Sequence, residues 1–135
     1  MKKQIVSFLM AAFLFAPCLR SLKFEVTDKE FTFILDNKDN SAILKDIYIP
    51  LQTKKKLEIP RTVDWCDQTF IVRGIMEYGI RKVIHRISSI TFPNTLYETE
   101  ETRKAYNWFL LFDVPVYVNN TPFFIGPTPF KFERR

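Results

Sequence analysis

The sequence predicts an α+β fold, a short and strand-rich solenoid with an N-terminal β-hairpin as its cap. Segments in which a short apolar strand ends at a proline recur at residues 44–50, 57–63 and 90–96, with the prolines at positions 50, 60 and 93. A variant segment follows at 111–116. A proline ends such a strand because it has no N–H to give to the ladder. Between the strands the apolar spacing changes to the period of an α-helix. Strands that recur around helical segments indicate stacked repeats.

Residues 1–18 have the three parts of a secretory signal peptide. Lys2 and Lys3 form a positive start, an apolar run extends from Ile5 to Ala16, and Ala16 and Cys18 supply small residues before a cut. The run is shorter than the roughly 20 residues of a membrane span. We therefore expect cleavage near Cys18 and export to the cell surface, the periplasm or the medium. A lipid-modified Cys18 and an uncleaved anchor helix are the alternatives.

The composition of the remaining chain excludes several partners and cofactors. Without residues 1–18 there are 18 basic and 15 acidic side chains, so the net charge falls from +5 to +3. A mild charge without a groove-reading motif argues against nucleic acid as a partner. The three glycines form no phosphate-binding loop, which argues against a nucleotide cofactor. In the full sequence of 135 residues, 47% are apolar and 14 are phenylalanine, which predicts one folded domain.

Residues 19–56 are expected to form the N-terminal β cap. Phe24, Val26, Phe31, Phe33 and Leu35 alternate with polar residues, the pattern of an antiparallel hairpin with one buried face. A polar loop at 37–41 leads into the strand at 44–50. Next come Lys54, Lys55 and Lys56, which we interpret as a solvated turn. A phosphate or heparin contact is the alternative.

A second hairpin and a helix are expected after residue 61. Residues 62–65 and 69–72 form the strands of this hairpin, with Cys66, Asp67 and Gln68 as the turn. The helix begins at Met76 and spans about three turns, because its apolar residues follow the helical period. These apolar residues are Met76, Ile80, Val83, Ile84 and Ile87, and the opposite side carries Arg81, Lys82, His85 and Arg86. We interpret the basic side as solvated, with contact to an acidic partner as the alternative.

A second helix is expected from Thr95 to about Phe109. Thr95 and Glu98 have the spacing of a capping box. Strands at 89–92 and 114–118 follow the two helices. Aligning residues 87–92 with residues 111–116 gives a period of 24 residues, a length typical of leucine-rich repeats.

Catalytic and metal-binding residues are not expected. His85 is the only histidine, and its basic neighbours disfavour its charged form. A Cys66–His85 nucleophile pair has no supporting spacing. Glu98, Glu100 and Glu101 are explained by the helix macrodipole. No cluster of Cys and His suggests a metal site.

The order and spacing of the motifs resemble the BspA-type leucine-rich repeat family. The similar segments are residues 57–63, 69–75 and 88–96, and the match covers roughly residues 44–120. The chain departs from the family pattern at Met76, Gly79 and Ile80. The resemblance implies leucine-rich-repeat-like units over 57–121 in a secreted or surface-displayed, non-enzymatic protein. It also implies binding to host extracellular proteins or other cell-surface proteins through the sheet face and loops.

Two further expectations concern the small number of repeats and the C-terminal tail. So few repeats leave open a truncated or decaying repeat protein, or a small periplasmic partner of a longer array. The tail, residues 122–135, contains three prolines that prevent another repeat. We expect Phe123, Phe124 and Phe130 to cover the last strand as a C-terminal cap. An exposed association patch is the alternative.

Overall fold

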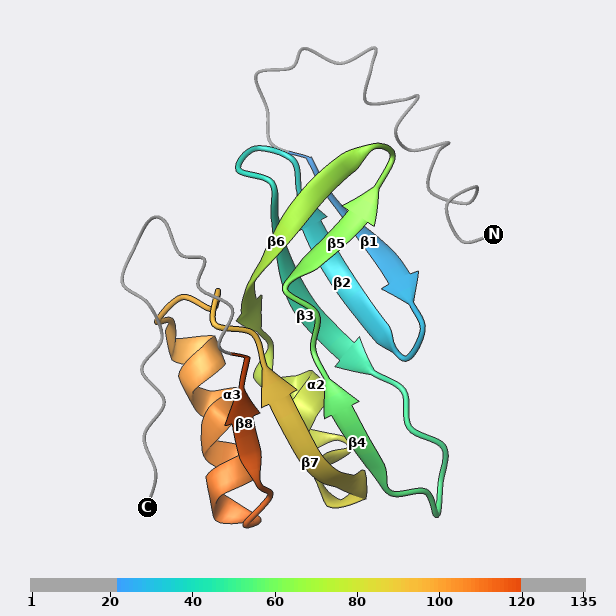
Figure 1. Ribbon diagram of the computed structural model, residues 1–135, viewed down its shortest axis with the longest axis vertical. Helices are drawn as coiled ribbons and strands as arrows, with labels where there is room; N and C mark the ends of the chain where they lie inside the picture. Colours follow the sequence, from blue (N-terminus) through green and yellow to red (C-terminus); the bar gives the residue numbers. More distant parts are fainter. Residues whose placement is uncertain (1–21, 120–135) are drawn as a thin grey trace.

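The computed structural model describes residues 22–119, which form two β-sheets with helices packed against them (Figure 1). Cys18 and residues 122–135, including Phe123, Phe124 and Phe130, lie outside the described residues, so the expectations about them stay predictions. Within the described part, no helix has the length and apolar character needed to cross a membrane. The strands are β1 Lys23–Asp28, β2 Phe31–Asp36, β3 Ser41–Ile47, β4 Lys55–Glu58, β5 Thr62–Trp65, β6 Gln68–Ile75, β7 Ile87–Phe92 and β8 Val116–Val118. The helices are α2 Glu77–Arg81, the 3₁₀ helix η1 Ile84–Arg86 and α3 Glu100–Leu111.

Sheet A contains five strands in the order β1-β2-β3-β6-β5. β1 pairs antiparallel with β2, and β5 pairs antiparallel with β6. Two residues connect β5 to β6, Cys66 at φ 51° and Asp67 at φ 62°. Positive φ at both turn residues is typical of a type I′ turn, which suits the right-handed twist of a hairpin. Gln68 pairs with Trp65, so the predicted three-residue turn is one residue too long.

Sheet A curls until its two outer strands face each other (Figure 1). The ring of Phe24 on β1 lies 6.2 Å from Trp65 on β5 and 6.4 Å from Phe70 on β6. These contacts join opposite ends of the strand order, and a flat sheet would hold them far apart. Trp65, Phe70 and Phe33 have no exposed surface. The alternating apolar residues of sheet A therefore line the inside of a half-barrel.

Sheet B contains three parallel strands in the order β4-β7-β8. Leu57 pairs with Ile90, and Ile90 pairs with Val116, so the strands are 33 and 26 residues apart in sequence. The predicted period of 24 is therefore wrong. Helix α3 continues to Leu111, and Asp113 then takes a positive φ of 55° in the turn. These extra residues delay the strand to Val116.

The first predicted helix is shorter than three turns. α2 ends at Arg81, Val83 leaves the helical region at φ −122°, and η1 follows. The chain has to become extended at Ile87 because this residue already pairs with Lys55 in sheet B. The apolar residues Ile80, Val83, Ile84 and Ile87 are nevertheless buried, as the pattern predicts.

Glycine lets α2 lie directly on the backbone of β3. A Cβ atom added at Gly79 would lie 2.3 Å from the Lys45 carbonyl oxygen and 3.0 Å from the Asp46 Cα. No side chain fits at these distances. Gly79, where the resembled family has alanine, therefore fixes how closely α2 approaches sheet A.

The N-terminus of α3 lies later than predicted. Thr99, not Thr95, is the cap, and its hydroxyl accepts a hydrogen bond from the Thr102 N–H at 3.1 Å. Thr95 is fully buried and donates its hydroxyl to the Val72 carbonyl oxygen on β6 at 2.6 Å. The chain is not yet helical after Thr95, because the Tyr97 N–H donates to the Arg73 carbonyl oxygen on β6 at 2.8 Å and Thr99 is itself extended, so the helix begins only at Glu100. Phe109 of α3 packs 5.5 Å from Phe92, which places the helix against the buried face of sheet B.

Candidate functional site

The outward face of sheet B forms a shallow hollow of about 540 Å³, which we name the sheet B hollow. Alternation along each strand produces this face, because successive side chains point to opposite sides of a sheet. The buried side carries Leu57, Ile90 and Val116, which are 0–5% exposed. The residues that line the hollow are Lys56, Leu57, Glu58, Ser88, Ser89, Thr91 and Tyr117.

The strand register arranges the lining side chains in two rows. Glu58 pairs with Thr91, and Thr91 pairs with Tyr117, so one row crosses all three strands. Lys56 pairs with Ser89 in the second row. Neighbouring strands lie about 4.8 Å apart. A ligand a few ångströms across therefore meets side chains from more than one strand.

A β-bulge adds a hydroxyl to the hollow. Lys55 pairs with Ile87, but the next residue of β4, Lys56, pairs with Ser89, which leaves Ser88 as the extra residue. A bulge changes the direction of the side chains around it. Ser88 and Ser89 both line the hollow as a result.

The polar side chains of the sheet B hollow have no partners among residues 22–119. Lys56, Glu58, Ser88, Ser89 and Thr91 form no side-chain hydrogen bond or ion pair there, and neither does the Tyr117 hydroxyl. Tyr117 is 56% exposed. The hollow therefore presents hydroxyl, carboxylate and ammonium groups that are free to bind something else.

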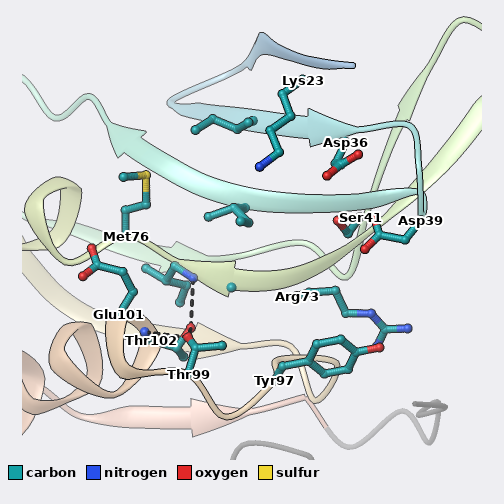
Figure 2. A pocket seen from close by; sticks show the side chains of 14 residues that line it. Lys23, Asp36, Asp39, Ser41, Arg73, Met76, Tyr97, Thr99, Glu101 and Thr102 are labelled. Carbon is teal, nitrogen blue, oxygen red and sulfur yellow. Dashed lines mark hydrogen bonds between the residues drawn. The ribbon is translucent and has the colours of Figure 1, made fainter. Parts of the chain in front are cut away.

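A second depression, the sheet A groove, lies on the outer face of sheet A (Figure 2). It has a volume of about 460 Å³. Its apolar lining comes from Ile34, Ile43, Ile75 and Met76, with Gly74 between them. The rim carries Lys23, Asp36, Asp39, Ser41, Arg73, Tyr97, Thr99, Glu101 and Thr102.

Many rim groups of the sheet A groove bind other parts of the chain. The Thr102 hydroxyl accepts a hydrogen bond from the Ile75 N–H at 3.3 Å, and Glu101 accepts one from the Glu77 N–H at 3.1 Å. Arg73 donates to the Thr95 carbonyl oxygen at 3.1 Å and lies over the Tyr97 ring at 4.4 Å. These contacts hold the start of α3 against β6 and α2, and the segment before α3 against β6.

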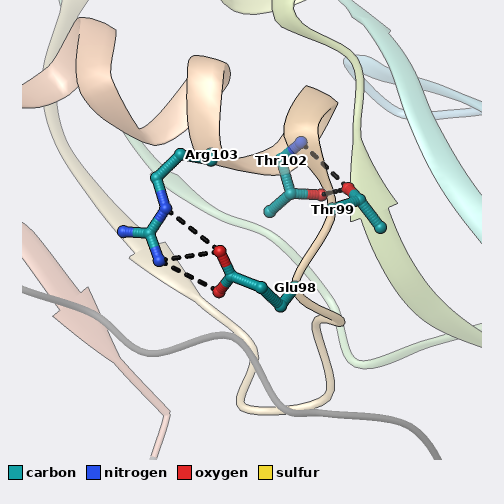
Figure 3. Close-up of polar contacts among 4 residues, drawn as sticks. All are labelled: Glu98, Thr99, Thr102 and Arg103. Atoms are coloured by element: carbon teal, nitrogen blue, oxygen red, sulfur yellow. Dashed lines mark hydrogen bonds and ion pairs between the residues drawn. The ribbon is translucent and has the colours of Figure 1, made fainter.

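Ion pairs are common on the rest of the surface. Arg103 binds Glu98 at 2.8 Å through two nitrogens, beside the Thr99 cap (Figure 3). The predicted macrodipole role therefore does not apply to Glu98, which precedes the helix, whereas Glu100 and Glu101 lie in its first turn. Lys45 pairs with Glu25 on the outer face of sheet A. This pairing distinguishes these surfaces from the sheet B hollow.

The structure separates the three lysines that were predicted to form a turn. Lys55 and Lys56 belong to β4, so the predicted turn is wrong for both. The Lys55 ammonium lies 3.9 Å from the Glu30 carboxylate. Lys54 precedes the strand and is exposed, whereas Lys56 lines the sheet B hollow. Of the three, Lys56 is the residue that the structure places in the candidate site.

The other basic candidates form no open patch. Arg81 lies 3.9 Å from Glu77, and Lys82 lies 2.7 Å from Asp46. The Arg86 guanidinium donates to the Ile49 carbonyl oxygen at 3.2 Å. Each of the three therefore already binds a neighbouring part of the chain.

Cys66 and His85 are far apart. Cys66 lies in the β5–β6 turn, and His85 lies in η1, which precedes β7 at the opposite end of the molecule (Figure 1). Among residues 22–119, no group of three or more His, Cys, Asp or Glu side chains is arranged to hold a metal ion.

Sequence reasoning missed most residues of the sheet B hollow. Glu58, Ser88, Ser89, Thr91 and Tyr117 were not among the candidate binding residues. A usable signal was present, because polar residues alternate with the apolar residues of each short strand. The outward positions of successive repeats come together once the repeats are aligned.

The comparisons with known proteins support a leucine-rich-repeat-like fold. No family model matches the chain, and no curated protein matches it. Among solved structures, it is similar to a leucine rich cell surface protein from Faecalibacterium prausnitzii A2-165, with a TM-score of 0.50 and 18% sequence identity. The alignment covers 73% of this chain and 24% of that chain. The chain therefore has a strand-rich, leucine-rich-repeat-like fold and spans about a quarter of the length of its structural neighbour.

Proposed function

We propose that this protein is a non-enzymatic binding protein displayed at the cell surface, and that it contacts its ligand through the sheet B hollow. The observation that carries the proposal is that six polar side chains without partners among residues 22–119 gather in one hollow. Such groups bind a ligand without first breaking a bond within the protein. Elsewhere the charged groups of Glu25, Asp46 and Glu98 are paired.

The surface location is supported by the fold and by the N-terminal sequence. The structural neighbour is described as a cell surface protein. The signal-peptide pattern of residues 1–18 agrees with export. A BspA-type protein would expose its sheet face to host extracellular proteins or to other cell-surface molecules, and the sheet B hollow is that face here. The hairpin of β1 and β2 in sheet A would then be the cap that precedes the first repeat strand.

A substitution at the centre of the hollow tests this proposal. Thr91→Arg places a long cation in the middle of the row that crosses all three strands. Gln68→Arg introduces the same side chain at the β5–β6 turn, outside the hollow, and is the matched control. Binding of the three proteins is measured by surface plasmon resonance against host extracellular proteins and cell-surface polysaccharides.

We expect the unmodified protein and Gln68→Arg to bind the same ligand with equal affinity. Thr91→Arg should weaken that binding at least about tenfold, which corresponds to about 1.4 kcal/mol. Equal binding by all three proteins would show that the ligand contacts another surface. Absence of binding to every ligand tested would contradict the proposal.

A second candidate function is a partner of a longer repeat array without independent binding activity. The observation that favours it is the position of β4, which is an outer strand of sheet B in the described part of the chain. An outer strand offers backbone groups for pairing with another strand. Light scattering of the purified protein with and without a longer leucine-rich repeat protein would detect such a complex. An unchanged mass in the mixture would exclude this candidate.

A further inference from the structure

We propose that the ligand of the sheet B hollow is a short neutral oligosaccharide, one ring of which lies on the side chain of Tyr117. This inference rests on the proposed function and adds the chemical class of the ligand. Three features of the hollow lead to it: its size, the balance of its charges and the type of its polar groups.

The size of the hollow favours a small ligand. The three strands have four, six and three residues. With a strand spacing of about 4.8 Å and a rise of about 3.3 Å per residue, the face is on the order of 100–200 Å². A stable protein–protein interface needs about 800 Å² on each partner. The hollow volume of about 540 Å³ lies instead in the range of small-molecule sites, which is about 300–1,000 Å³.

The charges of the hollow favour a neutral ligand. Among the lining residues that the structure describes, Lys56 carries the one positive charge and Glu58 the one negative charge, so this part of the lining has no net charge. A sulfated or phosphorylated ligand would meet the Glu58 carboxylate as well as the Lys56 ammonium. A neutral ligand with hydroxyl groups donates to the carboxylate and accepts from the ammonium, so it satisfies both.

The polar groups of the hollow match those of a sugar. Ser88, Ser89 and Thr91 supply three hydroxyls, each of which both donates and accepts hydrogen bonds. The adjacent hydroxyls of a sugar ring also do both. An apolar ligand would leave these groups buried without partners, which costs about 1–3 kcal/mol for each.

Tyr117 provides the apolar surface that a sugar ring requires. The residue is 56% exposed, and within residues 22–119 it is the one aromatic residue that lines the hollow. One face of a pyranose ring consists of C–H groups, and such a face packs well on an aromatic side chain. Tyr117 is in register with Thr91, which in turn pairs with Glu58. A ring on Tyr117 therefore directs its hydroxyls toward these two residues.

An extended peptide fits this face less well. The backbone N–H and C=O groups of a sheet point toward neighbouring strands and not out of its face, so they offer a peptide no ladder there. A peptide would then depend on apolar pockets for its side chains. In the described part of the chain, Leu57 is the aliphatic residue that lines the hollow, and it is 2% exposed.

The test uses the full chain and an array of neutral oligosaccharides of two to six rings, followed by calorimetric titration of the strongest ligand. We expect Tyr117→Ala to weaken binding at least about tenfold. Tyr117→Phe keeps the ring face and should stay within about threefold of the original affinity. Tyr48→Ala is the matched control, because Tyr48 is 72% exposed and lies outside the hollow. Its affinity should not change.

A second substitution tests the proposal independently, in case Tyr117→Ala also impairs folding. Thr91→Val removes the central hydroxyl and keeps the shape of the side chain, and it should also weaken binding about five- to tenfold. If no neutral oligosaccharide binds, or if Tyr117→Ala and Thr91→Val bind as well as the unmodified protein, the sugar proposal is overturned. A protein ligand that is lost in Thr91→Arg, without any sugar binding, would overturn the ligand class and leave the proposed function intact.

Discussion

The two sheets of this protein differ in how their strands are connected and in how their surfaces are used. Sheet A forms most of its pairs between strands that are close in sequence, joined by short turns. Sheet B pairs strands that are 33 and 26 residues apart, such as Leu57 with Ile90 and Ile90 with Val116. Parallel strands require such long connections because the chain has to return to the end of the sheet at which the previous strand began.

The outer surfaces of the two sheets also differ, in whether their polar side chains are paired. The outer face of sheet A carries paired groups, for example Lys45 with Glu25 and Thr69 with Asp64. The open face of sheet B carries polar groups without partners in residues 22–119. The binding role that we propose for sheet B is based on this difference between the two faces. Three substitutions test the comparison, from the largest expected effect to the smallest.

The first test compares the buried and open faces of sheet B. Phe92 has no exposed surface and packs against Phe109 and Tyr106 of α3 at 5.5 and 6.2 Å. Phe92→Ala should lower the free energy of unfolding by about 3–5 kcal/mol because it leaves a cavity. Tyr117→Ala, on the open face, should change it by less than about 0.5 kcal/mol. Urea denaturation measures both, and a loss below about 1 kcal/mol for Phe92→Ala would show that this strand does not form the core.

The second test concerns the contact through which α2 approaches sheet A. Gly79→Ala would place a Cβ 2.3 Å from the Lys45 carbonyl oxygen, so α2 has to shift. We expect a loss of about 1–3 kcal/mol in the free energy of unfolding, as for an overpacked site. Gly74→Ala is the control, because its nearest neighbour, the Thr102 hydroxyl oxygen, lies at 3.4 Å. Equal melting temperatures for the two variants would contradict the close packing of α2 on β3.

The third test concerns the contact between sheet A and α3. Thr102→Val removes the hydroxyl that accepts from the buried Ile75 N–H and keeps the shape of the side chain. We expect a loss of about 1–2 kcal/mol in the free energy of unfolding, because a buried N–H is left without a partner. Thr91→Val makes the same chemical change on the open face of sheet B and should have little effect on stability. A similar loss of unfolding free energy in both variants would show that Thr102 contributes no more to stability than Thr91 does.

Local sequence pattern was sufficient for features that depend on neighbours in the chain. Alternation identified Phe24, Phe33 and Leu35 as the buried face of sheet A, and all three are at most 5% exposed. The helical period likewise identified Ile80 and Ile84 as buried. The spacing of apolar residues predicts which side chains are buried, and this prediction does not depend on the exact residue at which the strand or helix ends.

Tertiary contacts decided the positions at which elements begin and end. Thr95 and Thr99 are both suitable helix caps by residue type, but Thr95 is held against Val72 of β6 in the segment before the helix, and Thr99 is the cap. The first helix is short because Ile87 is already paired in sheet B. Neither distant partner, Val72 nor Lys55, is visible in the local sequence.

The sequence by itself determined that short apolar strands and helical segments alternate in a strand-rich chain, because this information lies in the spacing of apolar residues. The tertiary structure alone decided which polar residues meet. The register of sheet B depends on where α3 ends and on the bulge at Ser88, and both are set by packing between distant segments. For this reason the sheet B hollow, where Glu58, Thr91 and Tyr117 form one row, became visible only in the folded protein.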